Sequence, residues 1–147
     1  MPKKILLAED DASVRDTLGR VLESEHNLVT FATTGHDAAD EFFADMPDLV
    51  LLSLDMLNQD DWGVFGFMRQ MHPLVPVIVI TAKSQQYKRA SDSRVDALME
   101  KPLDIPLLLE TIQSYLAESE TERVCRLARP DFKTVLLRDV VAEPHRA

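Results

Sequence analysis

Short apolar runs alternate with amphipathic stretches through the first 117 residues of the chain. The runs are nearly unbroken and rich in Val, Ile and Leu, which is typical of strands that are buried on both faces. Between the runs, apolar residues recur at helical spacing, as Val14, Leu18 and Leu22 do. The predicted strands are Ile5–Ala8, Asn27–Ala32, Leu49–Leu52, Val75–Ile80 and Ala97–Met99.

Each predicted strand is followed by a predicted helix. Asp104 is the expected N-cap of the last helix, with Pro106 in its first turn. Five βα units with buried strands and right-handed crossovers predict a doubly wound α/β fold around a five-stranded parallel sheet. The predicted helices run from Val14 to Glu25, from Ala38 to a point before Pro47, from Trp62 to Met71, from Ser84 to Ser91 and from Ile105 to Leu116.

The composition fits one ordinary domain with a tail. The 147 residues carry 16 basic and 25 acidic side chains, and a net charge of −9 argues against binding to nucleic acid. No apolar run approaches the roughly 20 residues that span a bilayer, and we recognise no secretory signal. We therefore expect a cytoplasmic protein without membrane contact. The single cysteine, Cys125, excludes an intramolecular disulfide and a cysteine-cluster metal site.

The periodic pattern stops near Ala117. We expect residues 1–117 to form the domain and residues 118–147 to form a C-terminal tail without a recognisable output domain. Residues 134–137 and 140–141 of the tail are too apolar for a free solvated segment. Two roles stay open for them: packing back on the domain, or a strand or helix that is contributed to a partner or to a second copy in a homodimer.

Charged and hydroxyl side chains follow four of the predicted strands. The strand ends carry Glu9–Asp11, Ser53–Asp55, Thr81–Ala82 and Lys101–Pro102. In a doubly wound sheet the working site lies beyond the carboxyl ends of the strands, so these ends are expected to converge. Carboxylates, a hydroxyl and an ammonium around one point favour a site for an oxyanion and for a hard cation such as Mg²⁺.

The sequence resembles the receiver domains of two-component response regulators, relatives of the chemotaxis protein CheY. The resemblance runs from Lys3 to Ala117 and rests on residues 3–11, 47–52, 76–82 and 100–103, in this order and spacing. It implies a flavodoxin-like (βα)5 fold with strand order 2-1-3-4-5. It also implies a signalling module in a phosphorelay, not an enzyme, with a histidine kinase or another signalling protein as its partner.

The resemblance also assigns roles to the residues at the strand ends. Glu9 and Asp10 match the acidic pair that holds Mg²⁺ in the family. Thr81 and Lys101 match the two residues that contact the phosphoryl oxygens. A backbone carbonyl near Asp55 would supply a further metal ligand.

The phosphoacceptor position departs from the family, which ends the third strand in Asp where this chain has Ser53. A serine hydroxyl is a weak nucleophile without an activating base, so aspartyl phosphorylation is expected to be lost or atypical. With one carboxylate fewer, Mg²⁺ is expected to bind weakly. Asp55 is an alternative acceptor only if the third strand continues far enough for positions 53 and 55 to share a face. Ser53→Asp is expected to restore phosphorylation.

Three further departures lie near the fifth strand. Arg94 stands where the family has Gly, which predicts a different turn. Leu98 stands at the position of the family's aromatic switch residue. The segment from Thr81 to Lys101 is about two residues shorter than is usual in the family, which predicts a shortened fourth helix.

One alternative of a different class stays open, a flavodoxin-like ligand-binding or catalytic domain. Such a domain would need a phosphate-binding loop after the first strand. The acidic Glu9–Asp11 segment would repel an anionic cofactor there.

Overall fold

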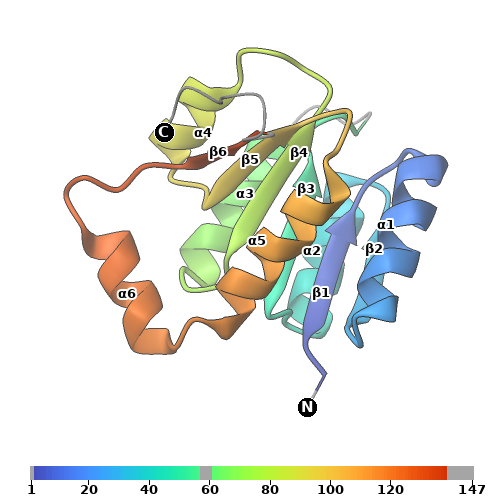
Figure 1. Ribbon diagram of the computed structural model, residues 1–147, viewed down its shortest axis with the longest axis horizontal. Coiled ribbons are helices and arrows are strands. Elements are labelled where there is room, and N and C mark those ends of the chain that lie inside the picture. The colour runs from blue at the N-terminus through green and yellow to red at the C-terminus, as the bar shows by residue number, and fades with distance from the viewer. Residues whose placement is uncertain (1, 57–60, 139–147) are drawn as a thin grey trace.

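The computed structural model describes residues 2–56 and 61–138. Its strands form one parallel sheet in the order β2-β1-β3-β4-β5-β6, so the predicted order 2-1-3-4-5 is confirmed and a sixth strand extends it (Figure 1). The strands are β1 (Lys4–Ala8), β2 (Leu28–Ala32), β3 (Leu49–Ser53), β4 (Val77–Thr81), β5 (Ala97–Glu100) and β6 (Val135–Leu137), and the helices are α1 (Ala12–Ser24), α2 (Gly35–Ala44), α3 (Asp61–Met71), α4 (Tyr87–Ser93), α5 (Ile105–Ala117) and α6 (Glu120–Ala128).

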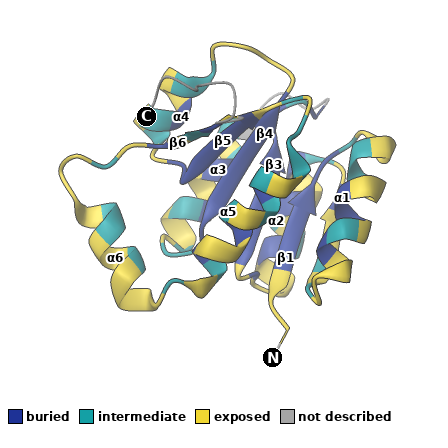
Figure 2. Cartoon of the chain, in the orientation of Figure 1, coloured by how far each residue is buried: buried dark blue, intermediate teal, exposed yellow. Residues whose placement is uncertain are grey.

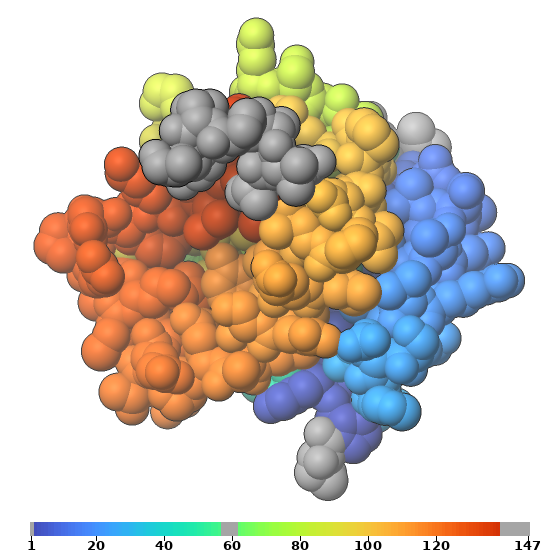
Figure 3. Space-filling view, in the orientation of Figure 1, coloured from blue at the N-terminus to red at the C-terminus, as the bar shows by residue number. Residues whose placement is uncertain are grey.

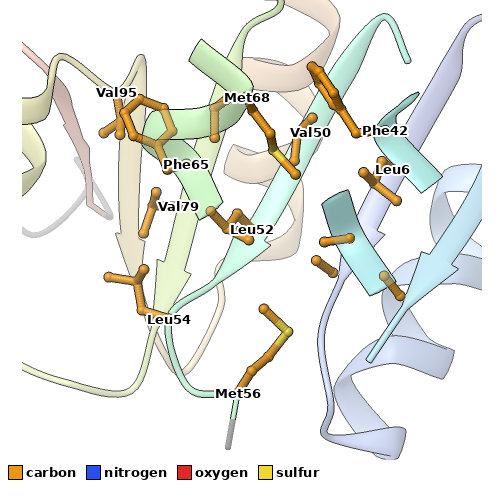
Figure 4. Close-up of a cluster of buried hydrophobic side chains, with 14 of the residues drawn as sticks. Leu6, Phe42, Val50, Leu52, Leu54, Met56, Phe65, Met68, Val79 and Val95 are labelled. Atoms are coloured by element: carbon orange, nitrogen blue, oxygen red, sulfur yellow. The ribbon is translucent and has the colours of Figure 1, made fainter. Parts of the chain in front are cut away.

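The sheet separates two hydrophobic clusters. All five residues of β3 and all five of β4 are buried, which explains why these strands lack polar alternation (Figure 2). One cluster joins Leu52 and Val79 to Phe42 of α2 and Phe65 of α3 (Figure 4). The other cluster lies on the opposite face under α1 and α5. Burial on both faces fixes the register of the central strands and therefore the places where they end.

Side-chain caps set the start of several helices. Asp11 accepts hydrogen bonds from the backbone N–H groups of Ser13 and Val14 at the start of α1. Asp104 accepts one from the N–H of Leu107, which confirms the predicted N-cap of α5. The fourth helix begins at Tyr87 instead of Ser84 and spans 7 residues. None of the helices in the described part of the chain is long and apolar enough to cross a membrane.

The C-terminal extension packs back on the domain, the first of its two predicted roles. Its strand β6 pairs in parallel with β5, and Val135 N–H donates to the Asp96 carbonyl at 3.1 Å. The buried Thr134 hydroxyl lies 2.7 Å from the carbonyl oxygen of Val95, and Tyr87 Oη donates to the Thr134 carbonyl. In the space-filling view the extension is continuous with α5 (Figure 3). Residues 140–141 lie outside the described residues.

The turn before β5 does not differ in the predicted way. Arg94 ends α4 with φ 61° and ψ 39°, the left-handed conformation that glycine adopts most easily. The Arg94 guanidinium lies 4.3 Å from the Phe132 ring centroid and donates to the Leu127 carbonyl. The backbone therefore keeps a glycine-like turn, while the larger side chain anchors the C-terminal extension.

Candidate functional site

The register of the sheet brings five predicted site residues to one edge. Glu9 follows β1, Ser53 ends β3, Thr81 ends β4, and Lys101 follows β5. Thr81 is the register partner of Glu100, and Lys101 N–H donates to the Thr81 carbonyl at 2.7 Å. Together with Asp55, these residues form what we call the strand-end cluster: Glu9, Ser53, Asp55, Thr81 and Lys101.

Lys101 links the two carboxylates of the cluster. Its Nζ lies 2.8 Å from Glu9 Oε1 and 2.9 Å from Asp55 Oδ2. Burial lowers the pKa of Lys101, but the bonds to Glu9 and Asp55 outweigh burial, and the net pKa lies above its ordinary value. Since Glu9 is fully buried, its charge depends on this ammonium for compensation.

The Asp55 carboxylate is the best-satisfied group of the cluster. Thr81 Oγ1 donates to Asp55 Oδ1 at 2.9 Å, and Ala82 N–H donates to Asp55 Oδ2 at 2.7 Å. Burial raises the pKa of Asp55, but the hydrogen bonds from Lys101, Ala82 and Thr81 together bring it below its ordinary value. Asp55, expected to supply a backbone carbonyl to a metal and weighed as an alternative acceptor, places its side chain at the centre of the cluster.

The backbone after β3 explains this placement. β3 ends at Ser53, whose pairing with Ile80 includes the hydrogen bond from Leu54 N–H to the Ile80 carbonyl at 3.0 Å, and Leu54 and Asp55 lie in a turn. Strand alternation therefore stops at Ser53, and the turn after it directs the Asp55 side chain toward Thr81 and Ala82. The condition that the third strand continues to position 55 is not met, and neither the turn nor the Ala82 donor could be predicted from the sequence.

The Ser53 side chain lies beneath the Asp55 backbone. Ser53 is fully buried, and its Oγ accepts a hydrogen bond from Asp55 N–H at 3.1 Å. Its hydroxyl oxygen thus supports the turn that carries Asp55. The Thr81 oxygen also accepts a hydrogen bond, from Lys83 N–H at 2.9 Å, which orients its hydroxyl proton toward Asp55.

Two other predicted positions lie apart from the hydrogen bonds of the cluster. Asp10 is half-buried, and its carbonyl accepts a bond of 3.4 Å from the Arg15 guanidinium. Leu98 is fully buried in the middle of β5, between its register partners Val79 and Leu136. The strand β6 therefore lies beside the position of the family's aromatic switch residue.

The arrangement of charges disfavours tight binding of a divalent cation. The Lys101 ammonium occupies the space beside Glu9 and Asp55 where a cation would need their oxygens. Glu9 Oε2 accepts a hydrogen bond from Asp11 N–H at 3.1 Å. Among residues 2–56 and 61–138, no three His, Cys, Asp or Glu side chains are grouped as metal ligands.

The comparison with known families identifies the family of the chain. The model of the response regulator receiver domain matches residues 5–113. The chain belongs to this family. Receiver domains are signalling modules of two-component systems, and the flavodoxin-like, CheY-like fold seen here is the one the resemblance implied.

Solved receiver structures match the fold closely. A CheY-like receiver domain protein from Methanospirillum hungatei gives a TM-score of 0.77 at 23% identity, over 83% of this chain and 99% of that one. The response regulator TrrA from Thermotoga maritima, solved in complex with Mg²⁺ and BeF, gives 0.69 at 27% identity, over 77% and 98% of the two chains.

Curated relatives are longer than this chain. The response regulator MprA of Mycolicibacterium vanbaalenii is 31% identical over 118 residues, which cover 79% of this chain and 51% of the relative. MprA of Mycobacterium bovis BCG is 28% identical over 148 residues, which cover 99% and 64%. The chain therefore spans between half and two thirds of the length of these relatives.

Proposed function

We propose that this chain is a receiver module that signals in the cytoplasm through protein contacts and does not depend on aspartyl phosphorylation. Its partner is a histidine kinase or another signalling protein of a two-component system. It performs no enzymatic reaction of its own and binds neither nucleic acid nor membrane. Any Mg²⁺ binds weakly, through Glu9, Asp10 and the Asp55 backbone carbonyl.

The observation that carries this proposal is the buried Ser53 hydroxyl at the end of β3. An alcohol at this place is a poor nucleophile unless a base removes its proton. The nearest carboxylate along the chain, Asp55, uses its oxygens to accept from Thr81, Ala82 and Lys101. Those contacts lower its basicity, so Asp55 is a weak base for activating Ser53.

The C-terminal extension covers the edge of β5, so we expect partners to bind at other surfaces of the domain. We propose that residues 1–117 are the receiver domain and that residues 118–147 are a C-terminal extension whose described part, 118–138, caps the domain within the same chain. Because β6 already pairs with β5, a homodimer or partner that adds a strand to this edge would first have to displace β6.

Intact mass spectrometry after incubation with Mg²⁺ and a small phosphodonor tests the proposal. We expect the wild-type mass to stay unchanged, because Ser53 is not activated and Asp55 is engaged. A gain of one acid-labile phosphoryl group would overturn the proposal. A receiver domain with an Asp at the phosphoacceptor position, treated in parallel, shows that the phosphodonor is active.

A further inference from the structure

Three donors from two neighbouring strand ends converge on one carboxylate. They are the Thr81 hydroxyl, the Ala82 backbone N–H and the Lys101 ammonium, at 2.9, 2.7 and 2.9 Å from the Asp55 oxygens. A hydroxyl, a backbone amide and an ammonium that point to one place are the donors that proteins use to bind oxyanions. The donors come from the sheet, whereas Asp55 comes from the segment after β3.

Both oxygens of the carboxylate take part in this arrangement. Oδ1 accepts from Thr81, and Oδ2 accepts from Ala82 and Lys101. Such a bidentate engagement leaves the three donors satisfied without an external ligand. The charges also disfavour an external anion while Asp55 is in place. The buried Glu9 shares Lys101 with Asp55, so a second anion would face two carboxylates and one ammonium.

We propose that the Asp55 carboxylate is a built-in occupant of an oxyanion site formed by Thr81, Ala82 and Lys101. The site has the donors for a carboxylate or a phosphate group, and the chain supplies the carboxylate itself. This inference deepens the proposed function and rests on it. It explains how Thr81, Ala82 and Lys101 stay hydrogen-bonded to one anion although the domain receives no phosphoryl group.

The site should accept a free carboxylate once the Asp55 side chain is removed. In Asp55→Gly the deleted group has the size of acetate, so acetate is the matched probe. We expect acetate to shift the Ala82 amide resonance of the ¹⁵N-labelled full chain saturably, with an affinity about tenfold or more above that of wild type, as for one charge-assisted hydrogen bond. Inorganic phosphate, added separately, tests whether the site also takes a tetrahedral oxyanion.

Asp48→Gly is the matched control, since Asp48 also accepts from a backbone N–H, that of Lys4 at 2.8 Å, but lies at the other end of β3. Acetate should leave Ala82 unchanged in this variant. If Asp55→Gly folds and acetate shifts its Ala82 resonance no more than in wild type, the built-in occupant is refuted. The proposed function would still stand if wild type gains no phosphate, so the two failures are distinguishable.

Asp55→Asn keeps the test decisive if the glycine variant does not fold. Replacing the carboxylate by an amide weakens the 2.7 Å bond from Ala82 and removes the charge that pairs with Lys101. The Ala82 amide proton should then move upfield relative to wild type. An unchanged Ala82 resonance in this isosteric variant would contradict the inference.

Discussion

Two carboxylates lie beyond opposite ends of β5, and each accepts from a backbone N–H and pairs with at least one cationic side chain. Asp96 precedes the strand and is 1% exposed, while Asp55 pairs with Lys101 after the strand and its side chain is 18% exposed. Asp96 accepts from Val77 N–H at 2.7 Å, from Arg69 at 3.1 Å and from Arg126 at 2.8 Å. The same chemistry therefore occurs twice in one sheet.

The difference between them lies in what the donors connect. The donors to Asp96 come from β4, α3 and α6, so the carboxylate fastens the C-terminal extension to the body of the domain. Arg126 also bonds Glu118 at 2.7 Å. Because the Arg126 guanidinium is partly buried, its charge is compensated by the carboxylates of Asp96 and Glu118 more than by water. Asp55 has a partly solvated carboxylate on the segment after β3 and is the more exchangeable of the two.

Removal of the extension should have the largest effect. Truncation after Ala117 deletes Arg126 and β6, so it breaks a buried ion pair and exposes the surface that Leu137 covers. Breaking such a pair costs about 3–5 kcal/mol, and burial of a leucine contributes about 1.5–3 kcal/mol. We expect the free energy of unfolding in urea to fall by about 5 kcal/mol. An unchanged unfolding midpoint would show that the extension does not stabilise the domain.

Replacing each carboxylate by an amide should lower the free energy of unfolding by different amounts at Asp96 and at Asp55. Asp96→Asn removes the carboxylate that pairs with Arg69 and one of the two that pair with Arg126, whose pair with Glu118 remains. Because the site is buried, we expect a loss of about 3 kcal/mol in the free energy of unfolding. Asp55→Asn keeps one acceptor in a site that water reaches, and we expect a loss of about 1 kcal/mol. Urea unfolding followed by circular dichroism measures both. Equal losses would contradict the contrast between a structural and an exchangeable site.

The Asp96 region should also show a dependence on alkaline pH. Burial raises the pKa of Tyr115 to about 12, and its hydroxyl donates to the Asp96 carbonyl at 3.0 Å. The pKa of Tyr115 in the folded state lies above its ordinary value of about 10. The contribution of the neutral hydroxyl to the free energy of unfolding is therefore complete below pH 10. It is lost as the pH rises from about 10 to about 12. Two pKa units correspond to at most about 3 kcal/mol.

Tyr115→Phe is the control for this prediction. The variant lacks the titrating hydroxyl, so the stability difference between wild type and variant should shrink between about pH 10 and 12. A difference that stays constant over this range, measured by urea unfolding, would show that Tyr115 does not titrate as its burial requires.

The fold was largely predictable because burial leaves a periodic signal. The apolar run Leu49–Leu52 predicts β3 nearly to its ends, and Asp104 marks the start of α5. The strand β6 has 3 residues, one of them exposed, and such a short segment carries no period. Its position depends on tertiary contacts of Thr134 that no local pattern encodes.

The candidate site was predictable in its members but not in its central contact. Strand ends predict that Glu9, Thr81 and Lys101 gather at one edge. The role of the Asp55 side chain depends on the turn after β3 and on the donors Thr81 and Ala82, which the sequence pattern does not predict. Likewise, the partners of Asp96 come from positions 27 and 30 residues away, a distance over which sequence spacing gives no geometry.

The proposed loss of aspartyl phosphorylation depends on both Ser53 and Asp55. Ser53→Asp supplies a nucleophile but leaves Asp55 on Thr81, Ala82 and Lys101, the donors that a phosphoryl group would need. Converting Asp55 to Asn as well releases Lys101 from this second charge. The structure thus modifies the expectation that Ser53→Asp alone is enough.

Intact mass spectrometry of the two variants, after equal exposure to Mg²⁺ and a small phosphodonor, measures this directly. We expect Ser53→Asp combined with Asp55→Asn to gain an acid-labile phosphoryl group several times faster than Ser53→Asp alone, and we expect wild type to gain none. Equal rates for the single and double variants, or phosphorylation of wild type, would contradict this expectation.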